Sequence, residues 1–231
     1  KGTRLNSITK GIPKVLVPIN SKPFIYLLLE SLVNNGFKKI FLLVSFKSDE
    51  IKNELGLFYK SIPIHYIEDN IKFKKGTGSA LLNAIDDLPE HFLLQYGDTI
   101  LNINYQEFYK RSKNLRNSML MSIFDNKNNL DKNNVYFKNN KLIYLNSESK
   151  HNLDKLKTAN FIDYGLLGIK KSFISKNIEI LKKNESLKFF QEKLSHLNLI
   201  KTYIVKNRFY EIGTPKSFSD FQNFYSNGEL K

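Results

Sequence analysis

The chain of 231 residues contains no cysteine and no tryptophan. Without cysteine there are no disulfide bonds, no thiolate metal sites and no cysteine nucleophile. Long hydrophobic runs are also lacking, because stretches such as Phe24–Glu30 and Phe41–Phe46 fall far below the ~20 apolar residues that a membrane-spanning helix needs. No secretory signal is visible. With 41% hydrophobic and 25% charged residues, the composition predicts a folded, soluble cytoplasmic protein with no membrane partner.

Arginine is scarce in an otherwise basic chain. Lys and Arg total 36 against 22 Asp and Glu, which gives a formal net charge of +14, yet only 4 of these cations are arginines. Arginine is the residue that usually reads bases and clamps phosphates, and the lysines are scattered along the sequence. We therefore interpret the charge as a solvated surface that attracts small anionic substrates, and we do not expect nucleic acid as a partner.

Hydrophobic periodicity predicts alternating strands and helices in the first half of the chain. Strands are expected at Lys39–Phe46, Ile62–Ile67 and Phe92–Tyr96. Helices are expected after Pro23 and after the loop Gly76-Thr77-Gly78. This order is typical of a mixed, mostly parallel sheet flanked by helices, so we predict a Rossmann-like α/β fold.

The second half has more turns and shorter apolar runs. Its predicted elements are strands at Ser118–Phe124, Phe161–Ile169 and Lys201–Val205, a hairpin around Asn139-Asn140, a polar loop at Asn146–Ala159, a mainly helical region at Phe173–Leu194, and a last helix from Thr214-Pro215 to about Tyr225. We predict one domain over residues 1–231, in which a nucleotide-binding half (1–116) runs without a linker into an acceptor-binding half (117–231).

Two glycine-containing segments have the composition of loops that approach phosphates or bases. In Gly2-Thr3-Arg4-Leu5, glycine permits a close backbone approach and Arg4 offers a fork of donors, while Lys14 adds a point charge ten residues later. The second segment, Lys75–Ala80, lacks the spacing of a P-loop but could pass beside a flat base. The alternative interpretation of the opening segment is a solvated lysine-rich loop.

Two carboxylates stand at positions where Mg²⁺ could bind. Asp98 follows the predicted strand Phe92–Tyr96, and open α/β sheets bind ligands at the carboxyl ends of their strands. Glu211 precedes the turn Gly213-Thr214-Pro215. Carboxylate oxygens are ligands that Mg²⁺ prefers. The alternatives are a turn or helix-cap aspartate at Asp98 and a simple helix start after Glu211.

Taken in order, these motifs resemble the sugar-1-phosphate nucleotidylyltransferases, also called nucleoside-diphosphate-sugar pyrophosphorylases. The stretch KGTRLNSITKGIPKVLVPINSKP resembles the opening motif of that family from its third glycine onward. KKGTGSALLNA resembles the base-holding loop, Gly97-Asp98 the metal-binding pair, Asp163-Tyr164-Gly165 the sugar-lining stretch and Phe209–Thr214 the last motif. Three departures stand out: Glu211 replaces the usual aspartate, Asp163 replaces the usual asparagine, and SESK is the nearest match to the motif that holds the sugar phosphate.

The resemblance implies a function and a set of residue roles. A nucleoside monophosphate would pass from a nucleoside triphosphate to a sugar 1-phosphate for surface polysaccharide synthesis, and the short chain and its ending look most like heptose or mannose 1-phosphate guanylyltransferases. The implied catalytic residues are Arg4 and Lys14, the metal ligands Asp98 and Glu211, the nucleotide-binding residues Gly2, Thr3, Gly76, Thr77 and Gly78, and the substrate-binding residues Asp163, Gly165, Glu148 and Lys150. The implied cofactor is Mg²⁺, and a homo-oligomer is possible.

The beginning of the chain also departs from the pattern. Such a domain normally opens with a buried strand, whereas this sequence starts with the charged, turn-like Lys1-Gly2-Thr3-Arg4. We therefore expect a strand of about ten residues to precede Lys1 in the working protein, as in the βαβ pattern of these folds.

Two other functions remain open from the sequence. One is a cytidylyltransferase that acts on a non-sugar phosphate, such as phosphocholine or an amino-acid phosphate, with the same fold and metal. The other is a non-catalytic regulatory relative, which the altered Glu211 and Asp163 would also fit.

Overall fold

The computed structural model describes residues 9, 11–68, 76–127, 130, 132–147, 154–184 and 186–227. The chain forms two compact units and passes from one to the other after Glu68, Gln95, Leu101 and Arg208. Unit 1 comprises Lys1–Glu68, Tyr96–Leu101 and Phe209–Lys231, and unit 2 comprises Asp69–Gln95 and Asn102–Arg208. These units do not coincide with the predicted halves 1–116 and 117–231. That one half binds the nucleotide and the other the acceptor stays a prediction.

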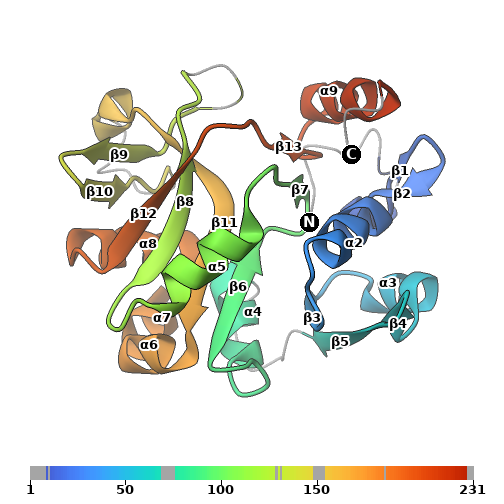
Figure 1. The fold of residues 1–231 in the computed structure, drawn as a ribbon, viewed down its shortest axis with the longest axis horizontal. Helices are drawn as coiled ribbons and strands as arrows, with labels where there is room; N and C mark the ends of the chain where they lie inside the picture. Colours follow the sequence, from blue (N-terminus) through green and yellow to red (C-terminus); the bar gives the residue numbers. More distant parts are fainter. Residues whose placement is uncertain are drawn as a thin grey trace. The chain divides into compact units, whose positions relative to one another are not determined.

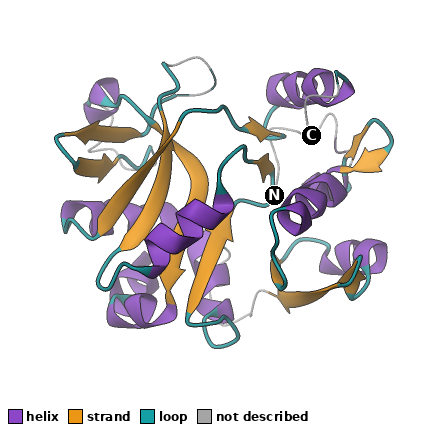
Figure 2. Ribbon diagram, viewed as in Figure 1, coloured by secondary structure: helices purple, strands orange, loops and turns teal. Residues whose placement is uncertain are grey.

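The described residues of unit 1 form three small sheets, each of two or three strands (Figures 1 and 2). In the largest, β3 (Ile40–Val44) runs parallel to β5 (Ile62–Glu68), and β4 (Phe58–Tyr59) pairs with β5 antiparallel. The other two are antiparallel pairs: β1 (Pro18–Ile19) with β2 (Lys22–Pro23), and β7 (Thr99–Ile100) with β13 (Tyr210–Glu211).

The helices of unit 1 cover a common apolar core. Among the residues that the structure describes, these helices include α2 (Phe24–Asn34), α3 (Ser48–Leu55) and α9 (Pro215–Ser226), with a 3₁₀ turn η2 at Lys14–Leu16. The apolar stripe of α2 is buried, and the ring of Phe24 meets that of Phe221 from α9 edge to face, with centroids 5.6 Å apart. Ile100 from β7 and Ile212, directly after β13, belong to the same core. This packing anchors the β7–β13 pair in unit 1.

Unit 2 is built on a sheet of four strands in the order β12, β8, β11, β6. β12 (Ile200–Val205) runs parallel to β8 (Met119–Phe124), whereas β11 (Ile162–Lys170) is antiparallel to both β8 and β6 (His91–Gln95). All residues of β11 except its last are buried, which is expected of a strand covered on both faces. Beside this sheet lies the hairpin of β9 (Val135–Lys138) and β10 (Lys141–Tyr144).

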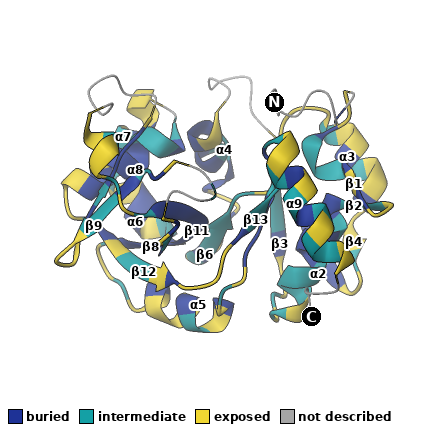
Figure 3. Cartoon of the chain, turned by 90° about the horizontal axis from the view of Figure 1, so that it is seen from above, coloured by how far each residue is buried: buried dark blue, intermediate teal, exposed yellow. Residues whose placement is uncertain are grey.

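Helices cover both faces of the sheet of unit 2. Figure 3 shows α5 (Tyr105–Lys113) on one face and α4 (Thr77–Ala84), α7 (Ile178–Asn184) and α8 (Leu187–His196) on the other. The described part of unit 2 also contains α6 (Lys171–Lys176) and a 3₁₀ turn η4 at Lys155–Thr158. Within the described part of the chain, no helix has the length and hydropathy needed to cross a membrane.

The structure confirms an α/β fold with mixed sheets. The predicted strands and hairpin are present, and the region predicted as mainly helical, Phe173–Leu194, is divided among α6, α7 and α8. Helix α4 begins at Thr77, one residue after Gly76, so most of the predicted glycine loop forms the first turn of the helix.

Candidate active site

Lys14 and Asp98, which the sequence predicts from separate motifs, form an ion pair in unit 1. Lys14 lies in the 3₁₀ turn η2, directly after Pro13, and its Nζ is 2.5 Å from Oδ2 of Asp98. The hydroxyl of Thr99 donates a hydrogen bond to the other carboxylate oxygen, Oδ1, at 3.1 Å. The side chain of Lys14 is 18% exposed and that of Asp98 35%. The pair can therefore meet a ligand from solvent while it is only partly screened by water.

Glu211 reaches the neighbourhood of Asp98 on strand β13. The antiparallel pairing of β13 with β7 puts Glu211 opposite Thr99, and the N–H of Ile212 donates to the C=O of Asp98 at 3.1 Å. The carboxylate of Glu211 lies over Gly213, where an added Cβ would come within 2.8 Å of its Oε1. The fold thus brings both predicted metal ligands onto adjacent stretches of chain.

The turn after Glu211 also starts helix α9. Thr214 is the N-cap, its Oγ1 accepts the N–H of Ser217 at 3.1 Å, and the hydroxyl of Ser217 accepts the N–H of Thr214 at 2.9 Å. Pro215 occupies the first turn, where a missing N–H costs nothing. The helix-start interpretation of this motif is therefore confirmed, and it is compatible with a ligand role for Glu211 because the capping box fixes the backbone just beyond it.

The donor set in unit 1 fits Mg²⁺ held together with a substrate. Mg²⁺ is usually bound through one or two carboxylates plus substrate phosphates, with water in the remaining positions. Asp98 and Glu211 would supply the two carboxylates, and the ammonium of Lys14 neutralises part of the charge of Asp98. No group of three or more His, Asp or Glu residues gathers among the residues that the structure describes. These residues therefore fit a metal that arrives with phosphate.

The predicted base-holding loop opens helix α4 in unit 2. Gly76 is the N-cap in an extended conformation, and the hydroxyl of Ser79 donates to its C=O at 2.8 Å. Gly76 and Thr77 are exposed, whereas Gly78 is buried. The exposed backbone at the start of the helix is accessible to a ligand, and Gly78 lies below it.

Asp163 and Gly165 form an irregular stretch in the middle of the sheet of unit 2. The pairing of β11 with β8 shifts register between Asp163 and Leu167, and Gly165 has a φ of +93°, which favours glycine. Oδ1 of Asp163 accepts the N–H of Gly165 at 2.9 Å, and its Oδ2 accepts the side-chain amide of Gln191 at 3.3 Å. The carboxylate therefore stabilises the bulge, and a direct contact of Asp163 with sugar stays a prediction.

Five predicted residues lie outside the described part of the structure: Gly2, Thr3, Arg4, Glu148 and Lys150.

Sequence reasoning missed two supporting side chains. Thr99 donates to Asp98, and Gln191 donates to Asp163. A signal existed for Gln191, because it lies one helical turn from the buried apolar residues Leu187 and Leu194 of α8 and is itself fully buried. An amide on the apolar side of a helix indicates a buried polar partner. No comparable signal marks Thr99.

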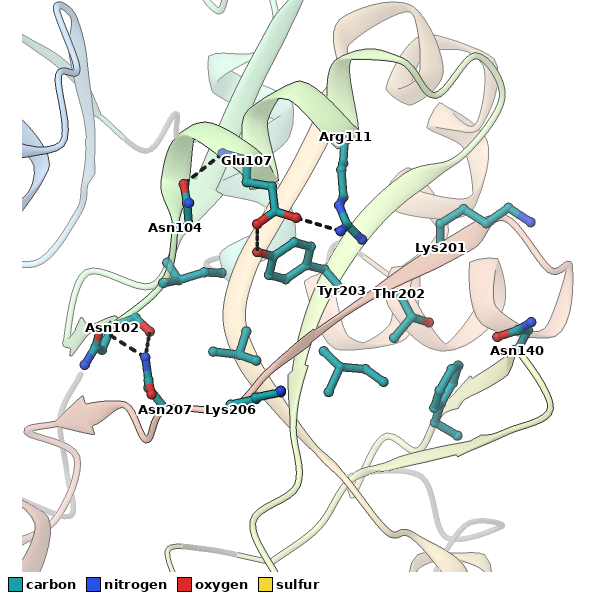
Figure 4. A pocket seen from close by; sticks show the side chains of 14 residues that line it. Asn102, Asn104, Glu107, Arg111, Asn140, Lys201, Thr202, Tyr203, Lys206 and Asn207 are labelled. Atoms are coloured by element: carbon teal, nitrogen blue, oxygen red, sulfur yellow. Dashed lines mark hydrogen bonds and ion pairs between the residues drawn. The ribbon is translucent and has the colours of Figure 1, made fainter.

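A pocket of about 780 Å³ lies in unit 2 along the outer edge of β12 (Figure 4). Its walls come from α5, β12 and the hairpin β9–β10, and its one carboxylate, Glu107, accepts hydrogen bonds from Arg111 at 2.6 Å and from Tyr203 at 3.0 Å. None of the predicted site residues line it. We therefore do not assign the pocket to the active site.

Known proteins resemble this chain in sequence and in structure. The Nucleotidyl transferase family model matches residues 1–228. UTP--glucose-1-phosphate uridylyltransferase AglF of Haloferax volcanii is 34% identical over 113 residues, which are 49% of this chain and 46% of that protein. D-glycero-alpha-D-manno-heptose 1-phosphate guanylyltransferase of Campylobacter jejuni is 27% identical over 220 residues, 95% of this chain and 94% of that protein. The crystal structure of HddC from Yersinia pseudotuberculosis has a TM-score of 0.71, with 23% identity over 96% of this chain and 94% of that one.

These similarities differ in what they cover. The chain spans less than half of the uridylyltransferase and nearly all of the guanylyltransferase. The likeness to HddC supports the Rossmann-like fold. Because the family match extends over nearly the whole chain and agrees with the motifs found in its sequence, the protein belongs to the Nucleotidyl transferase family.

Proposed function

We propose that this protein transfers a nucleoside monophosphate from a nucleoside triphosphate to a sugar 1-phosphate. The observation that carries the proposal is the meeting of Lys14, Asp98 and the strand of Glu211 in unit 1. An ammonium bonded to one carboxylate, with a second carboxylate on the neighbouring strand, suits the transfer of a phosphoryl-type group, because catalysis there consists mainly of positioning and charge stabilisation. We also propose a cytoplasmic location, where nucleoside triphosphates are available.

The reaction is an in-line displacement. An oxygen of the sugar 1-phosphate forms a bond to the α-phosphorus, and the bond between this phosphorus and the oxygen that bridges to the β-phosphate breaks, so that pyrophosphate leaves with its electron pair. The attacking oxygen is already ionised at neutral pH, and no general base is needed. Lys14 would donate hydrogen bonds to the reacting phosphates and stabilise the charge that develops on them.

Mg²⁺ would be held by Asp98 and Glu211, and when bound it would neutralise charge on the phosphate oxygens. Among the remaining residues, Arg4 would grip the leaving phosphates as a bidentate donor. Gly2, Thr3 and the loop Gly76-Thr77-Gly78 would bind the nucleotide. The bulge with Asp163 and Gly165, together with Glu148 and Lys150, would bind the sugar phosphate.

For the substrates we propose GTP and D-glycero-D-manno-heptose 1-phosphate, as the precursors of an activated sugar for surface polysaccharide. The support is the extent of similarity, because the heptose 1-phosphate guanylyltransferase matches over 95% of this chain. The shorter match to a uridylyltransferase, at 34% identity, makes UTP with glucose 1-phosphate the second candidate.

The test is pyrophosphate release by the purified chain with Mg²⁺, each of the four common nucleoside triphosphates, and a panel of acceptors. The panel contains heptose, mannose and glucose 1-phosphates, with phosphocholine as a non-sugar acceptor. We expect turnover with GTP and heptose 1-phosphate. Turnover with CTP and phosphocholine alone, or no turnover with any pair, would contradict the proposal.

A further inference from the structure

Tyr164 has a buried hydroxyl that joins two backbone segments distant in sequence. Its side chain is 1% exposed. The hydroxyl oxygen accepts the N–H of Asn102 at 3.1 Å, and its one hydrogen is shared between the C=O of Asn102 at 3.2 Å and the C=O of Arg208 at 3.3 Å. A single hydroxyl therefore links both segments within unit 2.

The two segments are those that continue into the proposed metal ligands. Asn102 follows Asp98 by four residues, and Arg208 precedes Glu211 by three. Between these ends the segments pair as β7 and β13, a ladder of only two residues on each strand. So short a ladder is marginal by itself. Besides the core packing of Ile100 and Ile212, its geometry therefore also depends on what holds the segments at Asn102 and Arg208.

A second, weaker link joins the same segments. The side-chain amide of Asn207 donates to the C=O and to Oδ1 of Asn102, at 3.4 and 3.3 Å (Figure 4). Both residues are exposed, so water competes for these bonds. The hydroxyl of Tyr164 is protected from this competition, and it is the stronger of the two links.

The bulge in β11 explains how Tyr164 is available for this contact. Neighbouring side chains on a strand point to opposite faces. Asp163 is hydrogen-bonded to the N–H of Gly165 and to the side chain of Gln191 in α8. Tyr164, between Asp163 and Gly165, is hydrogen-bonded to Asn102 and Arg208. The strand predicted to contact the sugar thus also holds the segments that carry the metal ligands.

We infer that Tyr164 is a positioning residue for the metal site, whose hydroxyl fixes the spacing of the segments bearing Asp98 and Glu211. The inference rests on the proposed function for its metal, and not on the identity of the substrates. Tyr164→Phe removes only the hydroxyl and keeps the ring in the core. The matched control is Ser195→Ala, which removes a buried hydroxyl bonded to two backbone groups, the N–H of Tyr144 at 3.0 Å and the C=O of Glu192 at 2.7 Å.

The experiment measures the Kd of Mn²⁺ alone by electron paramagnetic resonance, for the whole chain and each variant. Tyr164→Phe should raise the Kd by about three- to tenfold, because the ligand-bearing segments lose a shared anchor. Ser195→Ala should leave it unchanged even where thermal melting shows a similar loss of stability. If Tyr164→Phe does not fold, Asn207→Ala replaces it, with an expected rise of about two- to threefold.

Equal Mn²⁺ affinities for Tyr164→Phe and Ser195→Ala would overturn the inference, as would an unchanged affinity of Asn207→Ala where that variant is used. Wild-type Mn²⁺ affinity no higher than that of Asp98→Asn would also overturn it, because Asp98 would then not bind the metal. A weakened site in Tyr164→Phe in a protein that forms no nucleotide sugar would refute the proposed function and leave the inference standing.

Discussion

Lys14 forms an ion pair with the carboxylate oxygen of Asp98 that a metal ion would also bind. Its Nζ is 2.5 Å from Oδ2 of Asp98, and the ammonium is mostly buried. In the protein without nucleotide, the lysine therefore competes with a cation for this carboxylate. In the proposed reaction, the phosphates of a bound nucleoside triphosphate would offer the ammonium a new partner, and Asp98 would then be free to hold the metal.

Lys14→Met separates these two effects. Turnover, as kcat/KM, should fall by roughly two to three decades, because a donor to the reacting phosphates is lost in a partly desolvated site. Mn²⁺ should bind the nucleotide-free variant more tightly than the wild type, because the competing ammonium is gone. The control is Lys22→Met, which breaks a more exposed ion pair of unit 1, Lys22 with Glu30 at 2.7 Å. Equal kcat/KM in the two variants would exclude Lys14 from the reaction.

His91 makes folding sensitive to acid. Burial, with help from the nearby charges of Lys170 and Lys113, lowers the pKa of His91 from 6.5 to about 4. Its Nε2 is 2.9 Å from the hydroxyl of Ser112, and its Nδ1 is buried with no hydrogen-bond partner among the described residues. A proton on this ring therefore costs more in the folded chain than in the unfolded chain.

Acid destabilises the folded chain through the lowered pKa of His91. Between pH 6.5 and about 4 the unfolded chain binds more protons at this site, so stability is fully present above pH 6.5 and is lost as the pH falls toward 4. Since the ring is only partly buried, we expect a loss of about 1–2 kcal/mol. In urea unfolding, the free energy of unfolding should fall less between pH 7 and pH 4.5 for His91→Gln than for the wild type, by this amount. Equal drops would show that His91 does not titrate as described.

Helix α5 packs on β11 through a contact that leaves no room for a side chain. A Cβ added to Gly168 would lie 2.3 Å from Cβ and 2.5 Å from Oγ of Ser112, and 3.2 Å from the ring of Phe108. Gly168 is therefore required for the close approach of this helix to the sheet.

Gly168→Ala should lower the free energy of unfolding by about 1–3 kcal/mol through overpacking. The matched control is Gly97→Ala, because an added Cβ at Gly97 meets no atom within 4 Å. The double variant Gly168→Ala with Ser112→Gly should recover part of the loss, since it removes the nearest clashing atoms. Urea denaturation measures all three, and equal stabilities of the two alanine variants would refute the packing argument.

The elements that could be predicted from the sequence are those with a strong local pattern. The apolar strand β3, the hairpin turn at Asn139-Asn140 and the start of α9 at Thr214 all carry local signals and are present. The two-residue strands β7 and β13 have no local signal, because they exist only through pairing across 111 positions between Thr99 and Glu211. The bulge in β11 likewise could not be predicted from the sequence, although Gly165 marks its position.

In the candidate site, too, the residues could be predicted from local motifs, whereas their contacts could not. Asp98 and Glu211 were recognisable from their motifs, yet their closeness results from tertiary pairing. That Asp98 would be bonded to Lys14, and Asp163 to Gln191, depends on side-chain packing between elements distant in the chain. Patterns of residue types indicate which side chains carry chemistry, whereas their partners follow only from the fold.

Across the whole molecule the proposed site residues fall into the two compact units. Lys14, Asp98 and Glu211 belong to unit 1, whereas the Gly76–Gly78 loop and the bulge with Gly165 belong to unit 2. The chain passes between the units on both sides of the segment Tyr96–Leu101, which carries Asp98. The residues proposed for metal and phosphate therefore belong to one unit and those proposed for base and sugar to the other, although the two sets alternate along the sequence. The net charge of +14 of the whole chain favours the approach of anionic substrates.

The central claim is that Asp98 takes part in Mg²⁺-dependent nucleotidyl transfer, and kcat for pyrophosphate release by Asp98→Asn tests it most directly. With GTP, heptose 1-phosphate and saturating Mg²⁺, we predict a kcat roughly two to four decades below that of the wild type, with thermal melting little changed, because a metal-binding carboxylate is lost. Asp154→Asn, at a residue 97% exposed in unit 2, is the control and should keep full activity. Wild-type turnover in Asp98→Asn under these conditions would contradict the account.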